Sequence, residues 1–186
     1  MLLNYSDFKI AVLGLGYVGL PLALAFGEKY DVMGFDISER RVSDLKQGID
    51  ATQEIEKIKF EKSKHIKFTT ELNDLSRFNI YIITVPTPIS TNKKPDLSYL
   101  FSATENVSKI LKQGDIVIYE STVYPGCTED ECVPILECGS GLEYNKDFFC
   151  GFSPERINPG DKKNQLKDIV KVVSGSNQLA TEQINN

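Results

Sequence analysis

Short apolar runs alternate along this chain with longer segments whose apolar residues recur at helical spacing. Such runs, rich in β-branched residues and bounded by glycine, proline or polar residues, are typical of buried strands. They predict strands over residues 9–13, 32–35, 66–69, 80–85, 116–119, 148–151 and 169–173. The intervening segments predict helices over residues 17–29, 39–47, 97–112 and 127–138, and a short charged helix among residues 49–65. Ser38 and Asp96 are the predicted N-caps of two of these helices, and residues 139–141 are predicted to be a loop.

This alternation indicates an α/β protein with a Rossmann-type, doubly wound parallel sheet and helices on both faces. The chain shows no internal repeat and no low-complexity linker, so we predict a single domain over residues 1–186. Ligands of such folds bind beyond the carboxyl ends of the strands. The residues directly after each predicted strand are therefore the candidates for a binding site.

The first predicted strand leads directly into Gly14-Leu15-Gly16-Tyr17-Val18-Gly19, a glycine-rich turn that opens a helix. Gly14 permits a tight turn, Gly16 lets a pyrophosphate approach the backbone, and Gly19 lets the helix pack closely on the strand. Backbone N–H groups at the start of the helix would face the phosphates. The segment thus contains, in order, a strand, the glycine motif, a helix, a second strand and a terminal acid. This order predicts a dinucleotide site.

Asp36 ends the second predicted strand, where a carboxylate can accept both ribose hydroxyls of an adenosine. A carboxylate there repels the 2′-phosphate of NADP, so Asp36 favours NAD as the cofactor. Arg40 and Arg41 follow closely, and because arginine can bind that phosphate, the residues alone leave NADP as an alternative.

Polar segments follow three further predicted strands. Val85-Pro86-Thr87-Pro88 supplies a rigid turn that shapes the nicotinamide side of a pocket or simply ends its strand. Glu120-Ser121-Thr122 offers two hydroxyls for ribose, pyrophosphate or a reacting water, and an acid that is either buried or part of a salt bridge. Ser153-Pro154-Glu155-Arg156 contains a carboxylate that acts as general acid or base, or pairs structurally with the adjacent arginine.

Charge and cysteine content narrow the classes of ligand. The chain has 21 Lys and Arg against 26 Asp and Glu, so no concentrated basic face for nucleic acid is expected. It has no apolar stretch of membrane-spanning length and no secretion signal, so we expect a cytoplasmic protein without a membrane partner. The cysteines form no Cys-x-x-Cys pair and His65 is the single histidine, so neither a metal site nor a cysteine nucleophile is expected.

Several segments together resemble the UDP-glucose/GDP-mannose dehydrogenase family. They are Gly14 to Gly19, Asp36 with Arg41, Val85 to Pro88, Glu120-Ser121-Thr122-Val123-Tyr124-Pro125-Gly126, and Gly151-Phe152-Ser153-Pro154-Glu155-Arg156-Ile157-Asn158-Pro159-Gly160-Asp161. The last two are specific, because a generic Rossmann protein would not carry both. The final segment is most similar to bacterial members that act on UDP-N-acetylhexosamines for capsule or O-antigen polysaccharide biosynthesis.

The resemblance implies an oxidoreductase that converts the C6 alcohol of a UDP-sugar into a carboxylate while two NAD⁺ are reduced. It also implies that Gly14 to Gly19 bind the pyrophosphate and that Asp36 and Arg41 hold the adenosine. Val85, Pro86 and Thr87 would line the nicotinamide side together with Ser121 and Thr122.

For catalysis, the resemblance places Thr122 near the reacting water and matches Glu155 to the family's acid/base glutamate. Some members carry a second glutamate four residues later, where this chain has Pro159, so that role is not carried over. The family's nucleophilic cysteine in a Gly-Gly-x-Cys context, its central dimerisation helix and its C-terminal substrate domain have no counterpart in these 186 residues. We therefore expect this chain to bind NAD but not to complete the oxidation by itself, whereas the full-length protein would be a homodimer.

Two other readings compete with this one. A stand-alone NAD-binding or redox-sensing module would use the same cofactor site without catalysis. A methyltransferase also combines a glycine-rich turn with an acid after its second strand, but Gly19 and the Ser153-Pro154-Glu155 segment count against that class. Titration with NAD⁺, NADP⁺ and S-adenosylmethionine would separate the cofactor choices.

Overall fold

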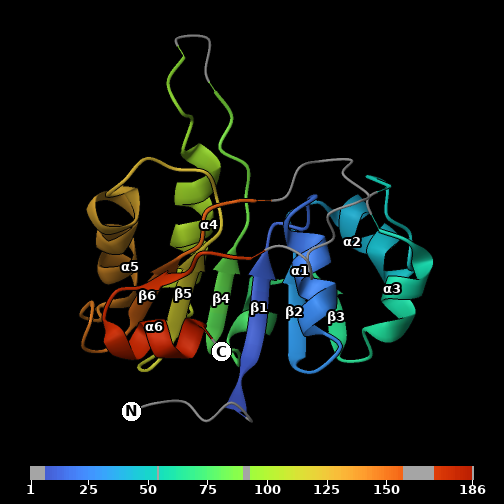
Figure 1. The fold of residues 1–186 in the computed structure, drawn as a ribbon, viewed down its shortest axis with the longest axis horizontal. Coiled ribbons are helices and arrows are strands. Elements are labelled where there is room, and N and C mark those ends of the chain that lie inside the picture. Colours follow the sequence, from blue (N-terminus) through green and yellow to red (C-terminus); the bar gives the residue numbers. More distant parts are fainter. Residues whose placement is uncertain (1–6, 54, 90–92, 157–169, 186) are drawn as a thin grey trace.

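A computed structural model describes residues 7–53, 55–89, 93–156 and 170–185. Its parallel strands are β1 (Lys9–Leu13), β2 (Asp31–Phe35), β3 (Ile66–Thr69), β4 (Ile80–Ile83), β5 (Ile116–Tyr119) and β6 (Phe149–Phe152). The short strand β7 (Ser174–Gly175) pairs with β6 in the antiparallel direction. The order across the sheet is β3-β2-β1-β4-β5-β6-β7, which confirms the predicted Rossmann-type doubly wound fold (Figure 1).

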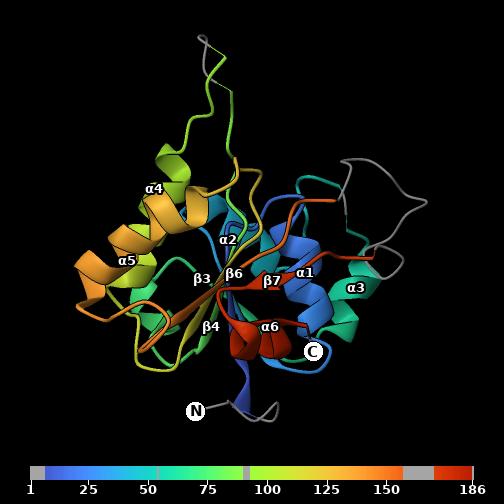
Figure 2. The same ribbon diagram turned by 60° about the vertical axis from the view of Figure 1, so that its left-hand side comes forward.

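Helices cover both faces of this sheet. They are α1 (Gly19–Phe26), α2 (Glu39–Lys46), α3 (Lys57–Lys62), α4 (Ser98–Ser108), α5 (Val133–Ser140) and α6 (Gln178–Ile184), joined by a 3-10 turn (Leu72–Leu75) and a π-helical turn (Thr128–Cys132). Figure 2 separates the two layers, with α4 and α5 on one side of the sheet and α1 and α6 on the other.

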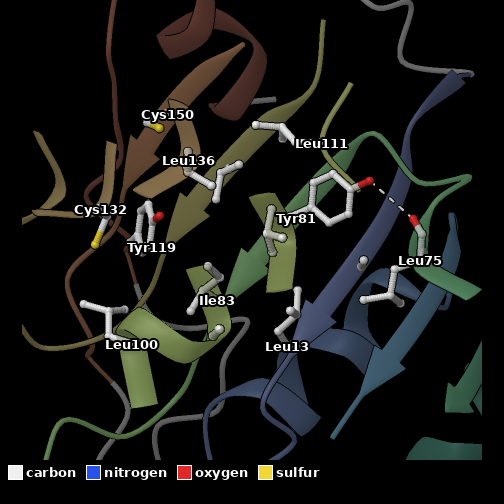
Figure 3. Close-up of a cluster of buried hydrophobic side chains, with 14 of the residues drawn as sticks. Leu13, Leu75, Tyr81, Ile83, Leu100, Leu111, Tyr119, Cys132, Leu136 and Cys150 are labelled. Carbon is white, nitrogen blue, oxygen red and sulfur yellow. Dashed lines mark hydrogen bonds between the residues drawn. The ribbon is translucent and has the colours of Figure 1, made fainter. Parts of the chain in front are cut away.

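Successive residues of the central strands point to opposite faces of the sheet and so pack into two separate hydrophobic cores. Ala11 and Leu13 pack with α4 and α5 in one cluster, part of which is drawn in Figure 3, whereas Ile10 and Val12 pack with α1 and α2 in the other. Because both faces of the central strands are covered, these strands have continuous apolar sequences rather than alternating ones. Burial of each large apolar side chain contributes about 1.5–3 kcal/mol, so the two cores hold the carboxyl ends of the strands in fixed positions.

Several predicted boundaries agree with the structure and others do not. Ser38 caps α2 as predicted, because its hydroxyl accepts the Arg41 N–H at 3.2 Å. The predicted strand over residues 80–85 ends earlier, at Ile83, and the Thr84 hydroxyl that follows it donates to the Gly14 carbonyl of the glycine-rich turn at 2.6 Å. The first helix is shorter than predicted at both ends, since residues 16–18 form the turn and Gly27 caps its end.

Three further expectations are corrected. Asp96 is not the N-cap of α4; it lies one residue before the N-cap, Leu97, and its carboxylate accepts the Ser98 N–H at 3.0 Å. Helix α5 continues through the predicted loop and ends where Gly141 adopts a φ of 71°. The last strand is not 169–173: residue 169 lies outside the described residues, 170–173 form no strand, and β7 is antiparallel, so the sheet is not wholly parallel.

Candidate functional site

A cavity of about 760 Å³ opens at the carboxyl ends of β1, β4 and β5. Strands β1 and β4 are neighbours from which the chain proceeds toward opposite edges of the sheet, so the cavity lies at the topological switch point. The predicted site residues that line it are Gly14, Leu15, Gly16, Tyr17, Val18, Asp36, Val85, Pro86, Thr87, Ser121, Thr122 and Glu155. Gly19 and Arg41 are predicted site residues that lie outside the lining.

The glycine-rich turn has the geometry that its sequence predicts. Gly14 adopts a φ of 93°, and its N–H donates to the Phe35 carbonyl at 2.9 Å. A Cβ on Gly19 would lie 1.9 Å from the Gly14 carbonyl oxygen, so only glycine lets α1 begin this close to the turn. A Cβ on Gly16 would meet nothing within 4 Å and would project into open space, where the resemblance places the pyrophosphate.

Asp36 is held at the edge of the cavity by backbone groups. Its two carboxylate oxygens accept the N–H groups of Leu15 and Ser38, each at 2.9 Å. Each carboxylate oxygen has further lone-pair capacity, so both ribose hydroxyls can still be accepted. The carboxylate is therefore preorganised between the glycine-rich turn and the start of α2.

Arg41 lies outside the cavity lining and hydrogen-bonds to the backbone of the glycine-rich turn. Its Nε and Nη2 donate to the Leu15 carbonyl at 2.9 and 2.8 Å, and its Nη1 donates to Asp50 at 2.7 Å. The expected contact of Arg41 with the adenosine stays a prediction. The structure assigns this guanidinium a position on the backbone of the turn.

Two hydroxyls on the predicted nicotinamide side tie neighbouring strand ends together. Ser121 donates to the Val85 carbonyl at 2.7 Å, and Thr87 donates to the Thr122 carbonyl at 2.6 Å. These bonds fix the segments after β4 and β5 against each other. The two bonds thus hold this part of the cavity wall together.

Acidic groups gather where β5 and β6 end. Glu120 lines the cavity although its side chain is only 7% exposed, and it forms an ion pair with Lys171. Burial raises the pKa of Glu120, Lys171 opposes that rise, and the nearby charge of Glu155 adds to it. Glu120 is therefore both a buried acid and a salt-bridge partner. Sequence reasoning missed Lys171, because nothing in its local sequence points to a contact with β5.

Thr84 is a second residue that the sequence reasoning missed. Its hydroxyl lies 2.6 Å from the Gly14 carbonyl oxygen, to which it donates, and 3.0 Å from that of Leu13, and the residue also lines the cavity. The only signal in the sequence is a hydroxyl near the end of an apolar run. Thr84 therefore anchors the glycine-rich turn to the end of β4.

None of the cysteines lines this cavity. Cys127, Cys132 and Cys150 are buried free thiols and Cys138 is exposed. Burial raises the pKa of Cys132 to about 12, which keeps it a thiol. In the described part of the chain no three His, Cys, Asp or Glu residues are grouped to hold a metal ion, and no helix there is long and apolar enough to cross a membrane.

The family model for the NAD-binding domain of the UDP-glucose/GDP-mannose dehydrogenase family matches residues 8–186. UDP-N-acetyl-D-glucosamine 6-dehydrogenase from Pseudomonas aeruginosa is 57% identical over 171 residues, which are 92% of this chain and 40% of that protein. Protein CapL from Staphylococcus aureus is 55% identical over 167 residues, which are 90% of this chain and 39% of that protein. The chain thus spans about 40% of the length of these curated relatives.

A solved structure shares the same architecture. The UDP-D-ManNAc dehydrogenase from Pyrococcus horikoshii superposes with a TM-score of 0.86 at 35% sequence identity. The match covers 96% of this chain and 43% of that one. Fold and sequence therefore lead to the same group of proteins.

Proposed function

This chain belongs to the UDP-glucose/GDP-mannose dehydrogenase family, within its NAD-binding domain, and we propose that it forms the oxidant's half of a UDP-sugar 6-dehydrogenase. The cofactor is NAD. One observation carries the proposal: a single cavity at the switch point collects the glycine-rich turn, the Asp36 carboxylate and the strand ends that carry Thr122 and Glu155.

The residues divide the cofactor site between them. The backbone of residues 14–18 receives the pyrophosphate, because the start of α1 offers N–H groups there and Gly16 leaves the approach open. Asp36 accepts the adenosine ribose hydroxyls. Val85, Pro86 and Thr87, with Ser121 and Thr122, form the wall beside the nicotinamide, which when bound supplies the hydride acceptor.

The names of the relatives support one substrate class. We propose a UDP-N-acetylhexosamine whose C6 alcohol is oxidised to a carboxylate in two steps, as a contribution to polysaccharide biosynthesis in the cytoplasm. Glu155, half-buried in the cavity, acts as general acid or base, and Thr122 lies beside the reacting water. The complete enzyme, as we propose it, is a homodimer.

Asp36→Ala tests the ribose assignment. We expect the Kd for NAD⁺ to rise at least about tenfold, since hydrogen bonds to a charged acceptor contribute about 1.5–3 kcal/mol each. Isothermal titration calorimetry of the wild-type chain and the variant measures this. Glu39→Ala, which removes an exposed acid outside the cavity lining, is the matched control and should bind as wild type does. Unchanged NAD⁺ affinity in Asp36→Ala would show that the ribose lies elsewhere.

Catalysis by the 186-residue chain can be tested separately. We expect no NADH when the purified chain is incubated with NAD⁺ and UDP-N-acetyl-D-glucosamine, because none of its cysteines lines the cavity as a nucleophile. The measurement is the absorbance of NADH formed in the presence of a large molar excess of NAD⁺ over the chain. Substrate-dependent NADH formation would contradict the expectation and assign the whole reaction to this chain.

A further inference from the structure

A line of hydrogen bonds connects the Asp36 carboxylate, which faces the proposed ribose site, to Asp50, a buried acid outside the cavity. Asp36 accepts the Leu15 N–H at 2.9 Å, while Arg41 donates to the Leu15 carbonyl through Nε at 2.9 Å and Nη2 at 2.8 Å. The Nη1 of Arg41 then donates to Asp50 at 2.7 Å. Leu15, the second residue of the glycine-rich turn, is therefore fixed at both its N–H and its carbonyl.

Asp50 is built to hold a negative charge in this position. Its side chain is 1% exposed, and it accepts the Thr52 N–H at 3.1 Å, the Thr52 hydroxyl at 2.7 Å and the Ile55 N–H at 3.0 Å. Burial acts to raise the pKa of Asp50, but the hydrogen bonds from Thr52 and Arg41 outweigh burial and lower it. The carboxylate therefore stays ionised beside Arg41.

The neighbouring arginine provides a contrast. The Arg40 side chain is 93% exposed, and its Nε lies 4.0 Å from Asp44. Exposed pairs of this kind contribute little to stability and hold neither side chain in place. The Arg41 side chain is 12% exposed and is committed to two fixed acceptors. Arg40 and Arg41 are the two arginines that could bind a 2′-phosphate. Of these, Arg41 has the fixed position, and its guanidinium binds the backbone instead.

We propose that Asp50 is a positioning residue for cofactor selection. It holds the Arg41 guanidinium on the Leu15 carbonyl and balances the positive charge of Arg41. As a result, the ribose site excludes a 2′-phosphate. The inference rests on the proposed NAD site and extends it. With the Arg41 charge balanced by Asp50, the Asp36 carboxylate next to the ribose repels the 2′-phosphate of NADP. Without Asp50, the guanidinium would keep its charge and lose one of its acceptors.

Asp50→Asn tests this with nearly unchanged side-chain shape. We expect the ratio of the Kd for NADP⁺ to the Kd for NAD⁺ to fall about tenfold at low salt and less at high salt, because the effect is a screened charge interaction. Asp44→Asn is the matched control, since it neutralises the carboxylate beside the adjacent arginine, and its ratio should stay at the wild-type value. Calorimetric titration of each chain with both cofactors gives the ratios.

Arg41→Gln provides a second, independent measurement should Asp50→Asn fold poorly. Removing the cation takes away the positive charge that Arg41 places beside Asp50, so the ratio should rise rather than fall. Equal changes in both Kd values, in either variant, would overturn the role of Asp50 and leave only a structural brace. If the wild-type chain binds NAD⁺ but both variants keep its ratio of Kd values, this inference alone is overturned. A wild-type chain that does not bind NAD⁺ overturns the proposed function, and the inference with it.

Discussion

Gly19→Ala is expected to lower the free energy of unfolding by about 3 kcal/mol, the upper end of the usual cost of forcing an extra methyl group into a packed site. The added Cβ would lie 1.9 Å from the Gly14 carbonyl oxygen and 2.3 Å from the Thr84 hydroxyl. Neither neighbour can retreat cheaply, because Thr84 donates to that carbonyl at 2.6 Å and the Gly14 N–H is bonded to Phe35. The helix must therefore move away from the sheet.

Urea unfolding followed by circular dichroism measures the loss for Gly19→Ala. A lower midpoint with an unchanged slope would indicate lost stability without a change in the surface exposed on unfolding. Gly27→Ala, at the C-cap of the same helix, makes an informative comparison, since its added Cβ would come no closer than 3.0 Å to any neighbour and should be tolerated better. A Gly19→Ala chain as stable as wild type would contradict the close helix–strand contact.

Gly16→Ala is expected to weaken NAD⁺ binding about a hundredfold while leaving the fold intact. The added methyl group would meet no protein atom within 4 Å, and the φ of Gly16 is not in the left-handed region, so alanine fits without strain. Stability should stay within about 0.5 kcal/mol of wild type or rise slightly, as Gly-to-Ala changes at compatible positions do. The methyl group instead occupies the space through which the pyrophosphate approaches the backbone.

Calorimetry and urea unfolding on the same Gly16→Ala preparation separate the two effects. We expect a lower affinity for NAD⁺ with an unchanged free energy of unfolding. A glycine needed only for the fold would give the reverse. Wild-type affinity in Gly16→Ala would place the pyrophosphate away from the turn and remove the main support for the cofactor site.

The sequence predicts the strands that local sequence marks better than those set by contacts between distant segments. Strands β1, β3 and β5 have the predicted bounds, since their apolar runs are ended by glycine or polar residues. Strand β7 escapes the prediction because two residues at the sheet edge produce no apolar run. The end of β4 at Ile83 also escapes it, because the apolar run continues to Val85 and the contact of the Thr84 hydroxyl with the glycine-rich turn is visible only in three dimensions.

The candidate site shows the same division. Residues of the glycine-rich turn, Asp36 and the segments after β4 and β5 line one cavity, as the position of strand ends in a doubly wound sheet predicts. Pairings between distant residues are a different matter, because local sequence does not encode them. The Glu120–Lys171 ion pair is of this kind. The Arg41–Asp50 pair joins residues nearer in sequence, but it too depends on how the chain after α2 folds back.

The most direct test of the central claim is calorimetric titration of the purified wild-type chain with NAD⁺, supported by thermal unfolding at increasing NAD⁺ concentrations. We expect saturable binding at one site per chain and a rise in Tm with NAD⁺, because a ligand that binds only the folded state stabilises it. A folded chain that gives no binding heat and no change in Tm at millimolar NAD⁺ would show that this cavity is not an NAD site.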